Sequence, residues 1–171
     1  PGQGSQVIGM GADLYEKSSI AKDIFDEVDE TLGRKLTDIV FSGSQEVLNK
    51  TENAQPAITA TSLACFSVFK DKFKDFTPSV TAGHSLGEYT SLSASNALSV
   101  SDTIRLVSER GRLMQIACDK NPGGMVAIIG MEIDVVEEVC REAGAYPSNI
   151  NSSQQVIISG DNDSLAIAVD L

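Results

Sequence analysis

The five residues GHSLG, at positions 83–87, constrain this chain more than any other stretch. Residues 78–83 are expected to form a short buried strand, and a helix is expected over residues 88–95. Between a strand and a helix this motif forms a sharp turn, the nucleophile elbow, in which flanking glycines let the backbone close without Cβ clashes. Ser85 is therefore the candidate nucleophile. The alternative is a glycine-flanked turn with no chemistry.

The sequence contains one histidine, His84, directly beside Ser85. A serine nucleophile needs a general base within hydrogen-bonding reach of its proton. Neighbouring residues of an extended segment point to opposite faces, so the His84 imidazole is expected to be directed away from Ser85. We therefore predict that His84 packs or hydrogen-bonds behind the turn. The chain as given is not expected to contain a conventional serine–histidine pair.

The composition disfavours several classes of protein. A net charge of −11 disfavours general nucleic-acid binding, which needs a surface that neutralises phosphates. No apolar run approaches the roughly 20 residues of a membrane span. The three cysteines lack CxxC spacing, and one histidine cannot complete a Cys/His cage, so no metal site is expected. Reduced cysteines and no signal segment indicate a cytoplasmic protein.

Residues 1–120 are predicted to form the N-terminal part of a large α/β domain. The chain opens on PGQGSQVIGMG, a glycine-rich loop of the kind that normally follows a strand in α/β proteins. Ser99 and Asp102 are suited to a capping box at the start of a helix. Apolar spacing predicts helices over residues 18–32, 53–73 and 99–120.

Residues 121–171 are predicted to form a small second subdomain, which begins at the NPGG break. The expected element order is β-α-β-β-α, with a tight turn between the second and third strands near residues 152–153. This order matches a ferredoxin-like α+β unit without its last strand. The predicted elements cover residues 124–131, 132–144, 146–151, 154–160 and 161–171.

Arg110 has an unusual position on its predicted helix. On a wheel of about 100° per residue it falls near the middle of a broad apolar arc. A guanidinium on a buried face is costly unless an anion meets it. Arg110 therefore either forms a structural salt bridge with an internal carboxylate or clamps the carboxylate of a substrate. The arc comprises Ile104, Leu106, Val107, Gly111, Leu113, Met114, Ala117 and Cys118.

Several segments together resemble the malonyl-CoA:acyl carrier protein transacylases and the related acyltransferases of fatty-acid and polyketide synthases. The segments are PGQGSQ, TENAQPAITA, GHSLGEY, SERGRLMQ, PGGMVAIIG and NSSQQVIISG, which extend over nearly the whole chain. The resemblance implies an α/β fold with a hydrolase-like core, in which helices cover a parallel sheet. It also implies a small ferredoxin-like subdomain, with both parts incomplete in this chain.

The resemblance also implies a role for individual residues. Ser85 would take the malonyl group from the CoA thioester as an ester. The backbone N–H groups of Gln3 and Leu86 would form the oxyanion hole, and Arg110 would bind the free carboxylate of malonyl. The pocket would be lined by Gln55 and Met114.

In this family the general base is a histidine in the second half of the large domain, and nothing in this chain matches it. The family's opening strand and several later strands are absent as well. We therefore expect the sequence to be an incomplete piece of a longer chain. Expressed alone, it is expected to be inactive and poorly folded.

The function implied is the transfer of malonyl from CoA to the phosphopantetheine thiol of acyl carrier protein, through a seryl ester, in fatty-acid biosynthesis. Malonyl-CoA and acyl carrier protein are the expected partners of a cytoplasmic monomer. No bound cofactor, nucleic acid or membrane is expected. The alternatives are a serine esterase or thioesterase, a polyketide-synthase domain that uses another carboxyacyl-CoA such as methylmalonyl-CoA, and a non-catalytic interaction fragment.

Overall fold

The computed structural model describes residues 2–171, which divide into two compact units. The first ends at Gln115 and the second comprises Ile116–Leu171. The two units are described separately below. Within residues 2–171, no helix is both long and apolar enough to cross a membrane.

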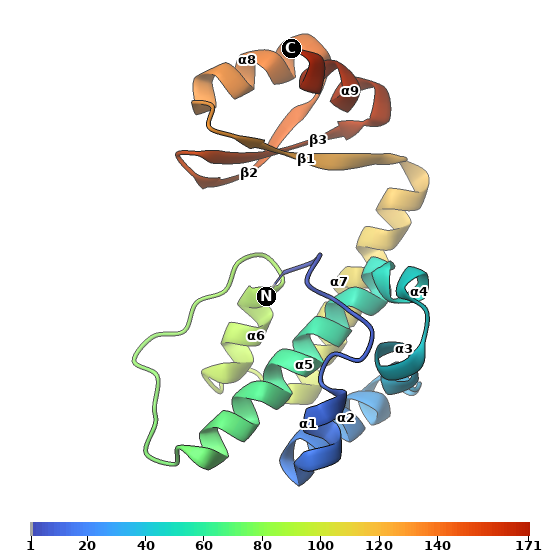
Figure 1. Ribbon diagram of the computed structural model, residues 1–171, viewed down its shortest axis with the longest axis vertical. Helices are drawn as coiled ribbons and strands as arrows, with labels where there is room; N and C mark the ends of the chain where they lie inside the picture. The colour runs from blue at the N-terminus through green and yellow to red at the C-terminus, as the bar shows by residue number, and fades with distance from the viewer. Residues whose placement is uncertain (1) are drawn as a thin grey trace. The chain divides into compact units, whose positions relative to one another are not determined.

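The first unit is built from helices around the long helix α5 (Figure 1). α6 lies on one side of α5, and α1 and α2 lie on the other (Figure 1). The predicted helices are confirmed, with α2 beginning one residue later and α5 two residues earlier than expected. The helices are α1 (Ala12–Lys17), α2 (Ser19–Leu32), α3 (Leu36–Ser42), α4 (Gln45–Asn49), α5 (Thr51–Lys72), α6 (Gly87–Ala94) and α7 (Val100–Lys120), which continues into the second unit.

Local signals in the sequence account for where these helices begin and end. The Ser18 hydroxyl accepts a hydrogen bond from Ala21 N at 3.3 Å and caps α2. Gly33 ends the same helix in the left-handed conformation, at φ 62°. At the start of α7, the Ser99 hydroxyl accepts from Asp102 N at 3.0 Å and donates to the Asp102 carboxylate at 2.7 Å. The Ser99 cap therefore forms as predicted. The Asp102 carboxylate accepts from the Ser99 hydroxyl, whereas in a capping box it would accept from the Ser99 backbone N–H.

The core of the first unit is built from buried side chains of helices α2 to α5 and α7 and of the turn before α6, with side chains of α1 packed against it. Its aromatic part consists of Tyr15, Phe25 and Phe41, whose ring centroids are 5.2 to 6.0 Å apart. Edge-on and tilted ring pairs of this kind add to the stabilisation from burial alone. The largest fully buried apolar side chains are Phe25, Val28, Leu36, Val40, Leu48, Ile104 and Val107, and Leu86 is 2% exposed.

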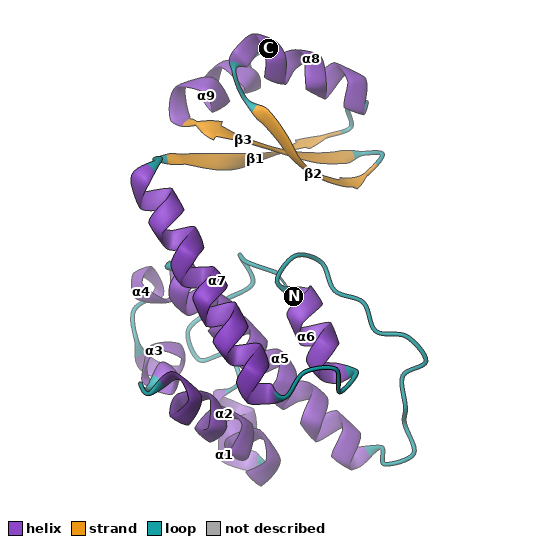
Figure 2. Cartoon of the chain, turned by 180° about the vertical axis from the view of Figure 1, so that it is seen from behind, coloured by secondary structure: helices purple, strands orange, loops and turns teal. Residues whose placement is uncertain are grey.

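The predicted strand over residues 78–83 is wrong for this structure, because the segment is a loop between α5 and α6 (Figures 1 and 2). A strand needs a neighbouring strand to satisfy its backbone N–H and C=O groups. Within residues 2–115 the structure describes helices and loops only, so the segment has no strand to pair with. The Thr81 hydroxyl instead donates to Ser91 O on α6 at 3.3 Å. Accordingly, the described residues form no parallel sheet.

The predicted apolar face of α7 is too broad. The buried residues of this helix are Thr103, Ile104, Val107 and Gly111, which form a narrow stripe. Leu106, Leu113 and Met114 are 47%, 52% and 36% exposed. The wheel counted every apolar side chain, whereas only the side of the helix that packs on its neighbours is covered. Arg110 therefore lies half-buried beside the stripe, not in the middle of a buried face.

The second unit is a three-stranded antiparallel sheet with two helices on one face (Figures 1 and 2). The strand order is β1-β3-β2, and the central pairing sets Val126 opposite Ile158. The order of elements predicted for this part of the chain is confirmed. The elements are β1 (Gly123–Ile129), α8 (Ile133–Ala143), β2 (Tyr146–Ser152), β3 (Gln155–Asp161) and α9 (Asn162–Asp170).

Alternation along β3 builds the core of the second unit. Val156 and Ile158 are buried against α8 and α9, together with Val136, Cys140 and Leu165. All residues of β2, an edge strand, are exposed.

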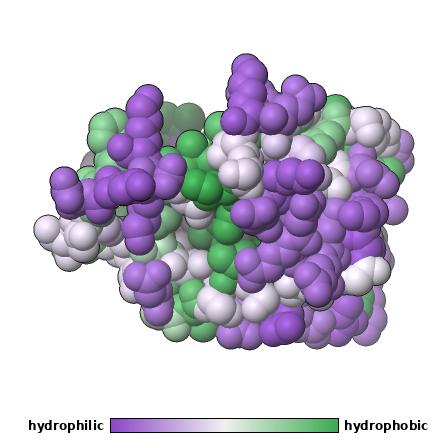
Figure 3. All heavy atoms as spheres, turned by 90° about the horizontal axis from the view of Figure 1, so that it is seen from below, coloured by the Kyte–Doolittle hydropathy of each residue, from purple (hydrophilic) through white to green (hydrophobic). Residues whose placement is uncertain are grey.

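One face of the molecule is largely hydrophilic and is crossed by a narrow hydrophobic band (Figure 3). Such a surface fits the ordinary fraction of charged residues, 22%.

Candidate active site

The turn that carries Ser85 is sharp, as the motif predicts. Ser85 has a φ of 52°, in the left-handed region that non-glycine residues rarely adopt. A Cβ added to Gly83 would lie 2.0 Å from the backbone carbon of Gly87, so position 83 has to be glycine. The buried Leu86 side chain anchors the turn in the core. The close approach of Gly83 to Gly87 and the buried Leu86 side chain therefore hold the strained backbone in place, while Ser85 itself is exposed.

Arg110 lies against this turn. Its Nη2 donates to Ser85 Oγ at 2.9 Å, and its Nη1 donates to Gln55 Oε1 at 2.6 Å. The guanidinium carbon lies 5.9 Å from the centroid of the Tyr89 ring. A cation over an aromatic face at this distance is attracted by the ring quadrupole. Three different helices, α5, α6 and α7, thus orient one guanidinium beside the serine.

No carboxylate meets Arg110 among the described residues. The ion pairs found within residues 2–171 are Lys35–Asp29, Arg105–Asp102 and Arg112–Glu109. The Arg112 hydrogen bond lowers the pKa of the Glu109 carboxyl below its usual value. The structural salt bridge considered as one explanation of Arg110 is therefore not formed within the described chain. Arg110 donates instead to two neutral oxygens, those of Gln55 and Ser85.

The second partner of Arg110, Gln55, is completely buried. A buried amide needs hydrogen-bond partners for both ends. Gln55 Oε1 accepts from Arg110, while Nε2 donates to Thr51 Oγ1 at 2.7 Å and lies 3.2 Å from the sulfur of Met114. Gln55 and Met114, both predicted to line the pocket, are therefore brought beside Arg110.

Gly111 explains how α7 comes so close to the start of α5. A Cβ at this position would lie 2.7 Å from Thr51 O and 3.0 Å from Glu52 Cα. Any side chain would therefore force the two helices apart. Gln115, one turn further along α7, accepts from Thr51 N at 3.1 Å. Gly111 thus allows α7 to approach the start of α5, and this approach brings the neighbouring Arg110 within hydrogen-bonding distance of Gln55.

Gln3 belongs to the same network through its side chain. Its Oε1 accepts from Thr51 Oγ1 at 2.9 Å. The glycine-rich loop is further held by Gln6, whose Nε2 donates to Asn49 Oδ1 at 3.0 Å and whose Oε1 accepts from Gly4 N at 2.8 Å. The loop is thereby fixed near the N-terminus of α5. The predicted oxyanion role of the backbone N–H groups of Gln3 and Leu86 stays a prediction.

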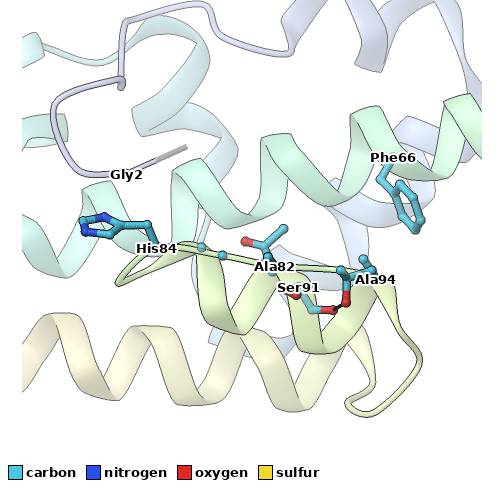
Figure 4. Close-up of a pocket in the computed structure, with 10 residues that line it drawn as sticks. Gly2, Phe66, Ala82, His84, Ser91 and Ala94 are labelled. Atoms are coloured by element: carbon cyan, nitrogen blue, oxygen red, sulfur yellow. Dashed lines mark hydrogen bonds between the residues drawn. The ribbon is translucent and has the colours of Figure 1, made fainter. Parts of the chain in front are cut away.

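A hollow of about 430 Å³ lies beside the turn (Figure 4). Its lining includes Gly2, Phe66, Gly83, His84 and residues of α6, but neither Ser85 nor Arg110. In Figure 4 the His84 ring extends away from Ser91 and Ala94, which line the other end of the hollow. Within residues 2–171, no group of three or more His, Cys, Asp or Glu side chains could hold a metal ion.

Two further residues of the network, Thr51 and Tyr89, were not among the predicted site residues. Thr51 lies four residues before Gln55, a spacing that places both side chains on one face of a helix. That signal was missed because the helix was expected to begin at residue 53. Tyr89 lies one turn after Ser85, and nothing in the sequence alone pairs its ring with a cation on another helix.

An exposed serine on a strained turn, next to an arginine without a carboxylate, defines a site suited to acyl transfer from an anionic substrate. The comparison with known families agrees: residues 1–171 match the acyl transferase domain, and the chain belongs to this family. Its α/β fold matches solved structures of malonyltransferases.

The most similar relatives include two curated bacterial proteins. The chain is 44% identical over 176 residues to the malonyl CoA-acyl carrier protein transacylase of Bacillus subtilis, covering 100% of this chain and 55% of that protein. It is also 44% identical over 164 residues to that of Haemophilus influenzae, covering 94% of this chain and 53% of that protein. The chain thus spans about half the length of the curated relatives it matches.

Two solved structures superpose closely. One is a malonyl-transacylase in complex with a type II polyketide-synthase acyl-carrier protein, with a TM-score of 0.91 and 40% identity over 99% of this chain and 56% of that chain. The other is the acyl-carrier-protein-S-malonyltransferase of Bartonella henselae, with a TM-score of 0.89, 40% identity and the same coverage.

Proposed function

We propose that this chain provides the nucleophile and the carboxylate-binding arginine of a malonyl-CoA:acyl carrier protein transacylase. The observation that carries the proposal is the 2.9 Å hydrogen bond from Arg110 Nη2 to Ser85 Oγ. It holds a cation with no carboxylate partner in the described chain beside an exposed hydroxyl. An acyl group with a free carboxylate, attached to that hydroxyl, would reach the guanidinium. The family membership and the names of the relatives support the same activity.

The reaction has two steps. Ser85 Oγ attacks the thioester carbonyl of malonyl-CoA, its proton passes to a general base, and the C–S bond breaks as CoA leaves. The phosphopantetheine thiol of acyl carrier protein then attacks the seryl ester, the C–O bond breaks, and Ser85 regains a proton. Each step passes through an oxyanion, which the backbone N–H groups of Leu86 and Gln3 would stabilise. The position of Leu86 at the start of α6, where the helix dipole is positive, supports this role.

Arg110 would select the acyl group. When malonyl is bound, its carboxylate replaces the Ser85 hydroxyl as an acceptor, while Gln55 keeps its hydrogen bond to Nη1. Hydrogen bonds to a charged group contribute about 1.5–3 kcal/mol each. An acetyl group offers no such acceptor, so the site would favour carboxylated acyl groups.

The same proposal includes the architecture predicted for the whole protein. Residues 1–120 would belong to a hydrolase-like domain with a parallel sheet, and residues 121–171 to a ferredoxin-like subdomain. The β1-β3-β2 order and the two helices on one face support the second assignment. An experimental structure of the complete protein tests both, and a large domain without a parallel sheet would contradict the first.

The remaining parts of the proposal concern partners and surroundings. Acyl carrier protein is the acceptor, and a related malonyl-transacylase has been solved with such a protein bound. We also infer a monomer without a bound cofactor that works in the cytoplasm. Sedimentation of the purified protein and fractionation of the source cells test the oligomeric state and the location.

The test is direct detection of the acyl-enzyme. The complete protein is mixed with malonyl-CoA and then with holo acyl carrier protein, and both proteins are weighed by intact mass spectrometry. We expect one malonyl group on Ser85, followed by its appearance on the carrier protein. The matched control is Ser85→Ala, which should carry none. Release of free malonate without a malonylated carrier protein would instead identify an esterase.

A further inference from the structure

Thr51 occupies a position from which one hydroxyl connects two parts of the site. It is the first residue of α5 and is only 5% exposed. Its Oγ1 accepts from Gln55 Nε2 at 2.7 Å and donates to Gln3 Oε1 at 2.9 Å. Thr51 thus lies between the glycine-rich loop and the glutamine that touches Arg110.

The directions of these hydrogen bonds are determined by Arg110. A guanidinium can only donate, so the atom of Gln55 that faces it has to be Oε1. The Nε2 end of the same amide therefore points to Thr51 and needs an acceptor there. Because the Thr51 oxygen accepts from Gln55, its single proton is free to go to Gln3. The chain of donors runs in one direction, from Arg110 through Gln55 and Thr51 to Gln3.

The fold does not need this hydroxyl for the helix itself. A threonine at the start of a helix often caps it, but the N-cap of α5 is Lys50 and no side chain provides the cap. The backbone of Thr51 is held by α7, because its N–H donates to Gln115 and its carbonyl packs on Gly111. Replacing only the hydroxyl should therefore leave the crossing of α5 and α7 in place.

We propose that Thr51 is a positioning residue for Arg110, which acts through Gln55. By accepting from Nε2, the hydroxyl prevents the buried amide from turning over, and so keeps Oε1 directed at the guanidinium. The guanidinium then keeps the orientation in which Nη2 faces Ser85. This inference rests on the proposed function, because it assigns to Thr51 the orientation of the group that would bind the malonyl carboxylate.

The test replaces the hydroxyl with a group of the same shape. Thr51→Val removes the acceptor and the donor together, and Thr51→Ser restores both. In the complete protein, we expect Thr51→Val to lower kcat/KM for malonyl-CoA about tenfold, the factor that corresponds to one lost hydrogen bond. Slow loading of Ser85 from acetyl-CoA, which has no carboxylate, should change less than about threefold. Thr51→Ser should recover malonyl transfer to within about threefold of the wild type.

The control is Thr61→Val, on the same helix. The Thr61 hydroxyl donates to the backbone oxygen of Ala57 at 2.9 Å, and the substitution should affect neither substrate. A general loss of folding would lower malonyl and acetyl loading equally, so equal losses in Thr51→Val would overturn the proposal. Unchanged malonyl loading in Thr51→Val would overturn it as well. A wild-type protein that forms no malonyl ester on Ser85 would refute the proposed function itself, and the role of Thr51 with it.

Discussion

Replacing Arg110 with alanine removes the group that we propose selects the substrate. In the bound state the guanidinium would make two hydrogen bonds to the malonyl carboxylate, each contributing about 1.5–3 kcal/mol. Because Arg110 is half-buried, the lower end of this range applies, which gives about 3 kcal/mol in total. A difference of 1.4 kcal/mol is a factor of ten, so kcat/KM for malonyl-CoA should fall by roughly a hundredfold.

The fold should survive this change. Alanine leaves Gln55 Oε1 without its partner, at a cost of about 1–3 kcal/mol unless water replaces the guanidinium. A thermal melt should therefore show one cooperative transition at a modestly lower temperature. Arg110→Lys keeps the charge but loses the planar fork, so its loss of malonyl transfer should lie between wild type and alanine.

The assay measures the rate of malonyl and acetyl loading onto Ser85 for each variant of the complete protein. Acetyl loading should be unchanged or faster in Arg110→Ala, because the hydroxyl no longer accepts from Nη2. Arg112→Ala is the matched control on the same helix, since Arg112 is exposed and pairs with Glu109 at 2.7 Å. Unchanged malonyl kinetics in Arg110→Ala would refute the carboxylate clamp.

Two further predictions concern the turn and the second unit. Gly83→Ala places a Cβ 2.0 Å from the Gly87 backbone, so the turn should no longer form as it does in the wild type. Labelling of Ser85 by a serine-reactive fluorophosphonate should therefore be lost, and the melting temperature should fall. Normal labelling would show that the turn can open without cost. Hydrogen bonds from Ser164 lower the pKa of Asp161. This carboxylate therefore stabilises the fold above its unfolded pKa, and the stabilisation is lost as the pH falls through the lower pKa of the folded state. Asp161→Asn should therefore narrow the difference in melting temperature between pH 7 and pH 2, and an unchanged difference would contradict this account.

Local patterns in the sequence were sufficient for much of the structure. Ser18 and Gly33 mark the two ends of α2, because a hydroxyl at the N-cap and a glycine at the C-cap act on their own helix. The turn at Ser85 was predictable for the same reason, since its glycines meet each other within five residues. The order of strands and helices in the second unit was likewise predicted from the sequence, because each element follows its own local apolar pattern and turn residues.

Contacts between distant segments were decided only by the tertiary structure. Residues 78–83 have a strand-like sequence, yet a strand forms only where a neighbour offers hydrogen bonds, and the described chain provides none there. The wheel overestimated the buried face of α7, because it cannot show which side another helix covers. Arg110 was singled out for the cost of burying a charge, but its partners Gln55 and Ser85 lie 55 and 25 residues away. Sequence thus determined where a candidate nucleophilic serine and an unusual arginine occur, and packing at Gly111 brought them together.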